Sequence, residues 1–90
     1  MDKIYLLVFD PYKTDASKLH ELIKNNQHIS NWWHYLGSGY LIKSRYTLNT
    51  IHNDILREWP NQRYLLIEVN PNNENGWLPR EAWDWIHQHR

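Results

Sequence analysis

The first apolar run of the sequence, Ile4 to Phe9, is apolar on both faces when it is laid out as a β-strand. Alternate side chains of a strand point to opposite faces, which here are Ile4, Leu6 and Val8, and Tyr5, Leu7 and Phe9. A strand of this kind lies in the middle of a sheet and is covered from both sides. Asp10-Pro11 ends the run, which is too short to span a membrane or to form the core of a signal peptide.

Composition describes one small domain with a large aromatic content. The chain has 90 residues, including six Trp and six Tyr, which supply the apolar area that a small core needs. Ten Lys and Arg balance ten Asp and Glu, whereas proteins that coat nucleic acid or anionic lipid depend on a basic excess. Cysteine is absent, which excludes a disulfide framework and a thiolate zinc site. We therefore expect a cytoplasmic protein without a membrane partner.

Hydrophobic periodicity predicts four strands and three helices. The strands are expected over 4–9, 29–35, 40–44 and 63–69, and the helices over 14–26, 48–59 and from Pro79 onward. This order, with right-handed crossovers, predicts an α+β fold, the ferredoxin-like split βαβ sandwich with antiparallel sheet order 4-1-3-2. Residues 1–71 form the predicted core of this single domain. Residues 72–90 form a turn and a short Trp-rich C-terminal helix, packed on the core or on a partner chain.

The predicted architecture places its first two helices on one face of the sheet and leaves the other face bare. Because the strand over 4–9 is apolar on both sides, something must cover that second face. One candidate is the C-terminal tail, through Trp77, Leu78, Trp83, Trp85 and Ile86. The other candidate is a second copy of the chain, and the two can combine. We therefore expect a homodimer.

One end of the predicted sheet collects residues that can carry chemistry: Asp10, Tyr12, His34, Ser38 and Arg63. A carboxylate, an imidazole, a hydroxyl and a guanidinium together can hold a divalent metal and a phosphate. In this hypothesis Asp10 binds Mg²⁺ or Mn²⁺, a symmetric dimer supplies the second Asp10, and His34 and Ser38 position the phosphate. The alternative is structural: Asp10 caps the turn, His34 is a hydrogen-bonded strand residue, and Ser38 belongs to the hairpin.

Basic and aromatic residues alternate near the end of the third predicted strand, where Lys43 and Arg45 neighbour Tyr40 and Tyr46. With Arg63 they are candidate contacts for single-stranded nucleic acid, through stacking and phosphate binding. Packing of these aromatics in the core or a dimer is the alternative, and zero net charge disfavours a nucleic-acid partner. His20 and His52 are expected on helix surfaces. The sequence contains no phosphate loop, zinc signature or dinucleotide fingerprint.

Residues 33–43, WHYLGSGYLIK, resemble the W-H-x-L-x-S-x-W-x-[IV] hairpin of the small bacterial SinR-like hypothetical proteins. These are grouped with the ferredoxin-like nucleases of CRISPR adaptation and with the VapD toxins. The ending Val8-Phe9-Asp10 and the segment 47–55 are also similar, and the likeness runs from about residue 3 to 69. It implies a ferredoxin-like fold, a homodimer, and a metal-associated aspartate, matching Asp10, at the dimer seam. Tyr40 stands where the pattern has Trp.

Two hypotheses from different classes follow. The first is a dimeric binding or interaction module with a protein partner, an accessory protein of a mobile element or defence system in a bacterium or phage. The second is a Mg²⁺- or Mn²⁺-dependent endonuclease of the CRISPR-adaptation or VapD type that uses Asp10 at the dimer seam. A single well-placed acid and the lack of a basic groove favour the module. The resemblance favours the nuclease, and single-stranded RNA binding on the open sheet is a third alternative.

Overall fold

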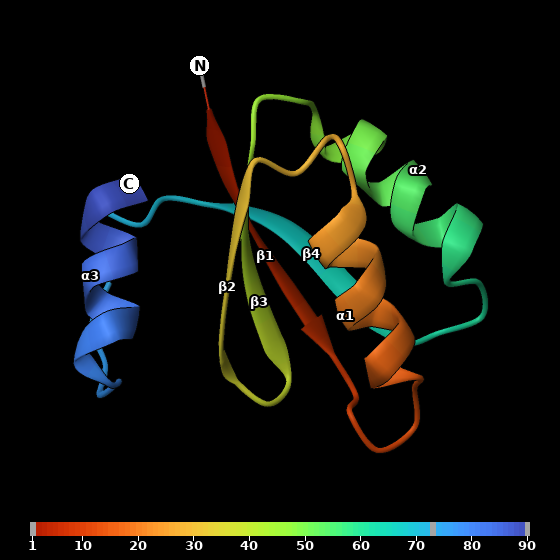
Figure 1. Ribbon diagram of the computed structural model, residues 1–90, viewed down its shortest axis with the longest axis horizontal. Coiled ribbons are helices and arrows are strands. Elements are labelled where there is room, and N and C mark those ends of the chain that lie inside the picture. Colours follow the sequence, from red (N-terminus) through yellow and green to blue (C-terminus); the bar gives the residue numbers. More distant parts are fainter. Residues whose placement is uncertain (1, 73, 90) are drawn as a thin grey trace.

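The computed structural model describes residues 2–72 and 74–89 (Figure 1). Its elements are β1 (Lys3–Phe9), α1 (Ala16–Asn25), β2 (Asn31–Leu36), β3 (Gly39–Ser44), α2 (Leu48–Glu58), β4 (Tyr64–Val69) and α3 (Arg80–His89). The strands form one antiparallel sheet in the order β2-β3-β1-β4. Read from the other edge this is 4-1-3-2, so the predicted ferredoxin-like fold is confirmed, with the doubly apolar β1 in the interior of the sheet.

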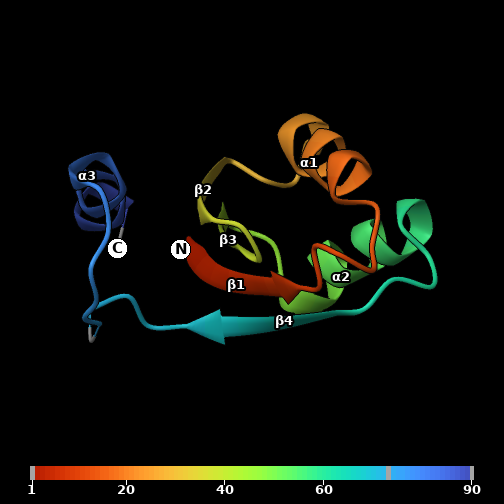
Figure 2. The ribbon, with the colours of Figure 1, turned by 90° about the horizontal axis from the view of Figure 1, so that it is seen from below.

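Helices α1 and α2 cover one face of the sheet (Figure 2). Each begins at a side-chain cap: Asp15 accepts a hydrogen bond from the Lys18 amide at 3.1 Å, and Thr47 accepts one from the Thr50 amide at 3.3 Å. Both helices bury one apolar stripe against the sheet. The resulting core consists of Tyr5, Leu7, Phe9, Leu19, Leu22, Ile23, Tyr40, Ile42, Ile51, Ile55 and Trp59.

Helix α3 packs on the opposite face of the sheet, beside β2 (Figure 2). Successive side chains of β2 point to opposite faces of the sheet, so its two tryptophans lie in different cores. Trp32 contacts the main core, and Trp33 points toward α3. Trp33 is 4% exposed and packs with Ala82 and Ile86, and its Nε1–H donates to the Ala82 carbonyl at 3.2 Å. A second, smaller core therefore joins the C-terminal helix to the sheet.

The cover provided by α3 is incomplete. Leu41 of β3 packs with the α3 core, but its row continues across the sheet to Leu6 and Ile67, and Ile67 is 46% exposed. Leu65 and Val8 pair in the next row and are 61% and 39% exposed. Val8, Leu65 and Ile67 are hereafter called the apolar strip. None of the helices within the described residues is long and apolar enough to cross a membrane.

Trp77 was expected to help cover the open face, and this expectation was wrong. The other tail residues, Leu78, Trp83, Trp85 and Ile86, belong to the α3 core, but Trp77 is 99% exposed. It lies in the connection that precedes α3, one residue after Gly76, whose positive φ of 159° favours glycine. The connection thus turns Trp77 into solvent before α3 reaches the sheet.

Candidate functional site

The predicted rim places Asp10 and Ser38 near each other, but both are engaged in turns. Asp10 Oδ1 accepts a hydrogen bond from the Tyr12 amide at 3.0 Å, and its carbonyl accepts one from Thr14 Oγ1 at 2.6 Å. The Ser38 carbonyl accepts a hydrogen bond from the Phe9 amide at 2.9 Å, while the residue itself is exposed in the hairpin. Within residues 2–72 and 74–89, no three His, Asp or Glu side chains form a group that could hold a metal ion.

The three predicted anion contacts do not gather in one patch. Lys43 lies opposite Ile4 at one end of β1, whereas exposed Arg63 directly precedes Tyr64, which is opposite Phe9 at the other end. The Lys43 ammonium already has partners, since Nζ lies 3.7 Å from an Asp2 carboxylate oxygen and 3.2 Å from His89 Nδ1. The Arg45 guanidinium stacks over the Tyr46 ring at 5.5 Å. Arg63 therefore lies at the opposite end of β1 from Lys43 and Arg45, and the last two are each engaged with groups of the chain itself.

His34 belongs instead to a cluster of rings between β2, β3 and α1. Its Nδ1–H donates to the Gly39 carbonyl at 3.0 Å, so in the neutral ring Nε2 is left as a hydrogen-bond acceptor. The ring stacks on Tyr40, with 4.0 Å between centroids and 5° between planes. Tyr40 is 1% exposed, and its hydroxyl shares a 2.8 Å hydrogen bond with His20 Nδ1. Burial raises the pKa of Tyr40 to about 12, which keeps the phenol neutral.

A pocket of about 330 Å³ opens beside these rings, lined by Phe9, Ala16, Ser17, His20, Glu21, His34, Gly37 and Tyr40. The prediction that His20 lies on the helix surface was wrong, because this half-buried ring stands edge-on to Trp32 at 5.2 Å. Its position four residues after Ala16 and three before Ile23 placed it beside the apolar stripe of α1, and that spacing was the available signal. The pocket brings the imidazoles of His20 and His34, the Tyr40 ring and the Glu21 side chain to one opening.

Replacing Tyr40 with Phe tests whether the ring cluster is held by its hydrogen bond. We expect Tyr40→Phe to lower the free energy of unfolding by about 1 kcal/mol, because the half-buried His20 loses its partner while the aromatic packing is kept. Denaturant unfolding measures the change. Tyr12→Phe is the matched control, since Tyr12 is 95% exposed, and it should leave stability unaltered. Equal effects of the two substitutions would contradict the expected contribution of the hydrogen bond.

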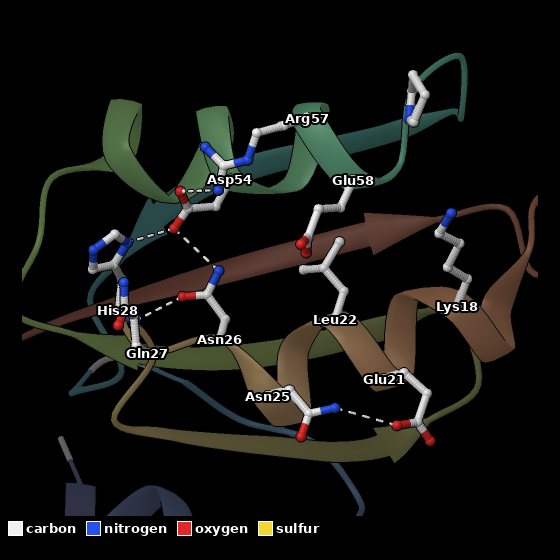
Figure 3. Close-up of a pocket in the computed structure, with 11 residues that line it drawn as sticks. Lys18, Glu21, Leu22, Asn25, Asn26, Gln27, His28, Asp54, Arg57 and Glu58 are labelled. Carbon is white, nitrogen blue, oxygen red and sulfur yellow. Dashed lines mark hydrogen bonds and ion pairs between the residues drawn. The ribbon is translucent and has the colours of Figure 1, made fainter.

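A larger groove of about 740 Å³ lies between α1 and α2 and contains residues that the sequence analysis did not single out (Figure 3). Asp54 of α2 is only 5% exposed and receives three hydrogen bonds. His28 Nδ1 donates to Oδ2 at 2.5 Å, Asn26 Nδ2 donates to the same oxygen at 3.1 Å, and Arg57 Nη2 donates to Oδ1 at 3.2 Å. This cluster is hereafter called the Asp54 network.

Burial acts to raise the pKa of Asp54, but the hydrogen bonds from His28, Asn26 and Arg57 outweigh it and hold the pKa below its ordinary value. The network also reaches β3, because Ser44 Oγ donates to the His28 carbonyl at 2.6 Å. A His–Asp pair is a familiar general base, yet Asp54 already accepts hydrogen bonds from three side chains of the chain itself. The groove holds two cations, Lys18 and Arg57, beside the carboxylates of Glu21, Asp54 and Glu58. The arrangement therefore fits a structural link between the α1–β2 connection and α2.

The remaining candidate is a surface, formed by the apolar strip and by the free edge of β4. The two edges of the sheet differ. The β2 pairing shifts register between Trp33 and Leu36, whereas β4 pairs with β1 at six consecutive positions. Tyr64, the first residue of β4, has a buried hydroxyl with no hydrogen-bond partner among the described residues, and burial raises its pKa. The protein thus presents a regular, apolar strand edge next to an unsatisfied polar group.

The comparisons with known proteins found no relative, so the function is argued from the structural observations above. The chain matches no protein-family model, and neither curated proteins nor solved structures provided a match. In class, the molecule is an α+β domain with a four-stranded antiparallel sheet whose second face is covered in part by its own C-terminal helix.

Proposed function

We propose that this protein is a homodimeric interaction module in which two copies of the chain associate through the β4 side of the sheet, with their apolar strips side by side. The observation that carries the proposal is the apolar strip, because Leu65 and Ile67 are 61% and 46% exposed on a sheet face whose other half is buried under α3. The resemblance of residues 33–43 to the SinR-like hairpin supports a role as a cytoplasmic accessory protein of a mobile element or defence system.

A second copy suits this surface better than a charged partner does. Val8, Leu65 and Ile67 are apolar, and a net charge of zero means that two copies do not repel each other at long range. Stable interfaces bury about 1,200–2,000 Å² in total, with an apolar centre and a polar rim. Two apolar strips supply such a centre, and exposed Arg63, two residues before Leu65, flanks it as a rim residue.

The endonuclease hypothesis takes second place because of Asp10. Its carboxylate accepts a hydrogen bond from the Tyr12 amide, which is the geometry of a residue that caps a turn. The described part of the chain adds no second and third ligand to it, so a metal at Asp10 depends entirely on how two copies approach each other.

Measurement of mass in solution tests the module. We expect light scattering or sedimentation at micromolar concentration to give twice the 11.1 kDa of one chain. Leu65→Glu combined with Ile67→Glu should return the mass to that of one chain, because four carboxylates would meet in the interface. The matched control is Leu56→Glu, since Leu56 is 48% exposed on α2, away from the strip. A wild-type mass of one chain would overturn the proposal, as would a strip variant that still dimerises like the control.

A further inference from the structure

The free edge of β4 is the better of the two sheet edges for adding another strand. An exposed edge strand presents unpaired backbone N–H and C=O groups, and proteins usually protect it with irregularities, charges or a covering element. The β2 edge has such protection, because its register shifts between Trp33 and Leu36 and α3 packs on it. The β4 edge is regular from Tyr64 to Val69, and Glu68 is its one charged residue.

Symmetry restricts how two β4 edges can pair. Directly opposed residues of neighbouring strands point to the same face of a sheet, so in an antiparallel pair of identical strands a residue faces one an even number of positions away. The pairing can therefore centre on Leu65, Leu66 or Ile67. A centre at Leu65 sets Arg63 against Ile67, and a centre at Ile67 sets Glu68 against Leu66.

A centre at Leu66 gives complementary pairs on both faces. Leu65 then faces Ile67 twice, which joins the two apolar strips into one surface. On the helix-covered face Tyr64 lies opposite the partner's Glu68, so the one charged side chain of β4 lies beside a tyrosine and not against a second carboxylate. One register thus sets apolar side chains against apolar ones and keeps the two Glu68 carboxylates apart.

We infer that two copies join through their β4 edges, antiparallel about a two-fold axis between the two Leu66 residues, to form one continuous eight-stranded sheet. The inference rests on the proposed dimer and specifies its geometry. Main-chain hydrogen bonds between the edges provide the association, as in other cases of strand addition, and the side-chain pairs fix the register. In this arrangement the Glu68 side chain of each copy lies beside Tyr64 of the other.

Single cysteines test the register directly, because the chain contains no cysteine of its own. Opposed residues have Cα atoms about 4.5–5.5 Å apart, within the range that a disulfide bridges, whereas a two-residue offset separates them by more than about 7 Å. Leu66→Cys should therefore cross-link with itself. Leu65→Cys and Ile67→Cys should each remain uncrosslinked alone and form a covalent dimer when mixed, about tenfold more than either alone.

Mild oxidation followed by a non-reducing gel reads out all of these variants, with Leu56→Cys on α2 as the exposed control. The Leu65→Cys and Ile67→Cys mixture keeps the test independent of Leu66→Cys, whose half-buried site faces the core. Self-cross-linking of Leu65→Cys or of Ile67→Cys alone would overturn the register. If the wild type has a two-chain mass and no variant cross-links beyond the control, the edge pairing is wrong while the proposed module stands. A wild-type mass of one chain removes both.

Discussion

Replacing Trp33 with Ala should detach α3 from the sheet and lower the free energy of unfolding by about 3–5 kcal/mol. The side chain is 4% exposed, forms the centre of the small core with Ala82 and Ile86, and donates a hydrogen bond to the Ala82 carbonyl. Its removal leaves a cavity and deletes the hydrogen bond from β2 to α3. Because the α3 core is separate from the main core, the loss should appear first as local opening of α3.

Denaturant unfolding and amide hydrogen exchange measure the two parts of this effect. Exchange at α3 amides should accelerate in Trp33→Ala, while amides of β1 retain more of their protection. Trp77→Ala is the matched control, since it removes the same side chain from a site that is 99% exposed, and we expect a change within about 0.5 kcal/mol. If α3 kept its protection in Trp33→Ala, the hydrogen bond and packing described for this helix would not be what holds it.

The fold was predictable because its main signals are local. A continuous apolar run marked β1. Apolar stripes that follow a capping residue, Thr14 or Asp15 in the first case and Thr47 in the second, marked the two helices of the main layer. The handedness of crossovers then left few topologies, and the sheet order followed. The tail could be recognised as a cover for the open face, since the need for a cover came from β1 itself. The hydrophobic pattern does not show how much of the open face the tail covers, because that depends on the packing of its side chains. Trp77 illustrates the point, since it belongs to the apolar tail and yet lies in solvent.

The polar sites could be predicted only in part, because they are made by contacts between distant segments. Asn26 and His28 meet Asp54 although they lie 28 and 26 residues before it in the sequence, and none of the three belongs to a motif. Asp54 did leave a signal: it lies three residues after Ile51 and one before Ile55, so that a carboxylate falls within the buried stripe of α2. The rim residues were predicted from topology alone, which brings chain segments to one end of the sheet but does not set their hydrogen bonds.

Confirmation of the inferred edge pairing would also decide between the two functional hypotheses. Asp10 follows Phe9, which is opposite Tyr64, and the pairing puts the partner's Glu68 beyond Tyr64. Three strand spacings and six residues along the strands then separate the two Asp10 residues by about 25 Å, whereas metals in a shared two-metal site lie about 4 Å apart. A dimer joined at β4 therefore cannot assemble the Asp10 metal site. Cross-linking at β4 would argue against that endonuclease mechanism as directly as it supports the module.

The other large effect expected from a single substitution is at Asp54, where Asp54→Asn should destabilise the protein by about 2–4 kcal/mol at neutral pH. The carboxylate is 5% exposed and accepts hydrogen bonds from His28, Asn26 and Arg57. An amide turns its own N–H groups toward these donors and loses the charge that they stabilise. Since Arg57 is 67% exposed, most of the loss comes from the other two partners.

The stability difference between the wild type and Asp54→Asn should depend on pH and should be smaller in acid. The pKa of Asp54 is lowered in the folded protein, so its stabilisation is complete above the unfolded pKa of about 4 and is lost as pH falls through the lowered value. Denaturant unfolding at pH 6 and near pH 3 should therefore show the gap between wild type and Asp54→Asn narrowing in acid. Asp84→Asn, at an exposed position of α3, is the matched control and should show no such gap. A gap that stayed constant with pH would mean that the Asp54 network stabilises the fold by shape and packing rather than by its charge.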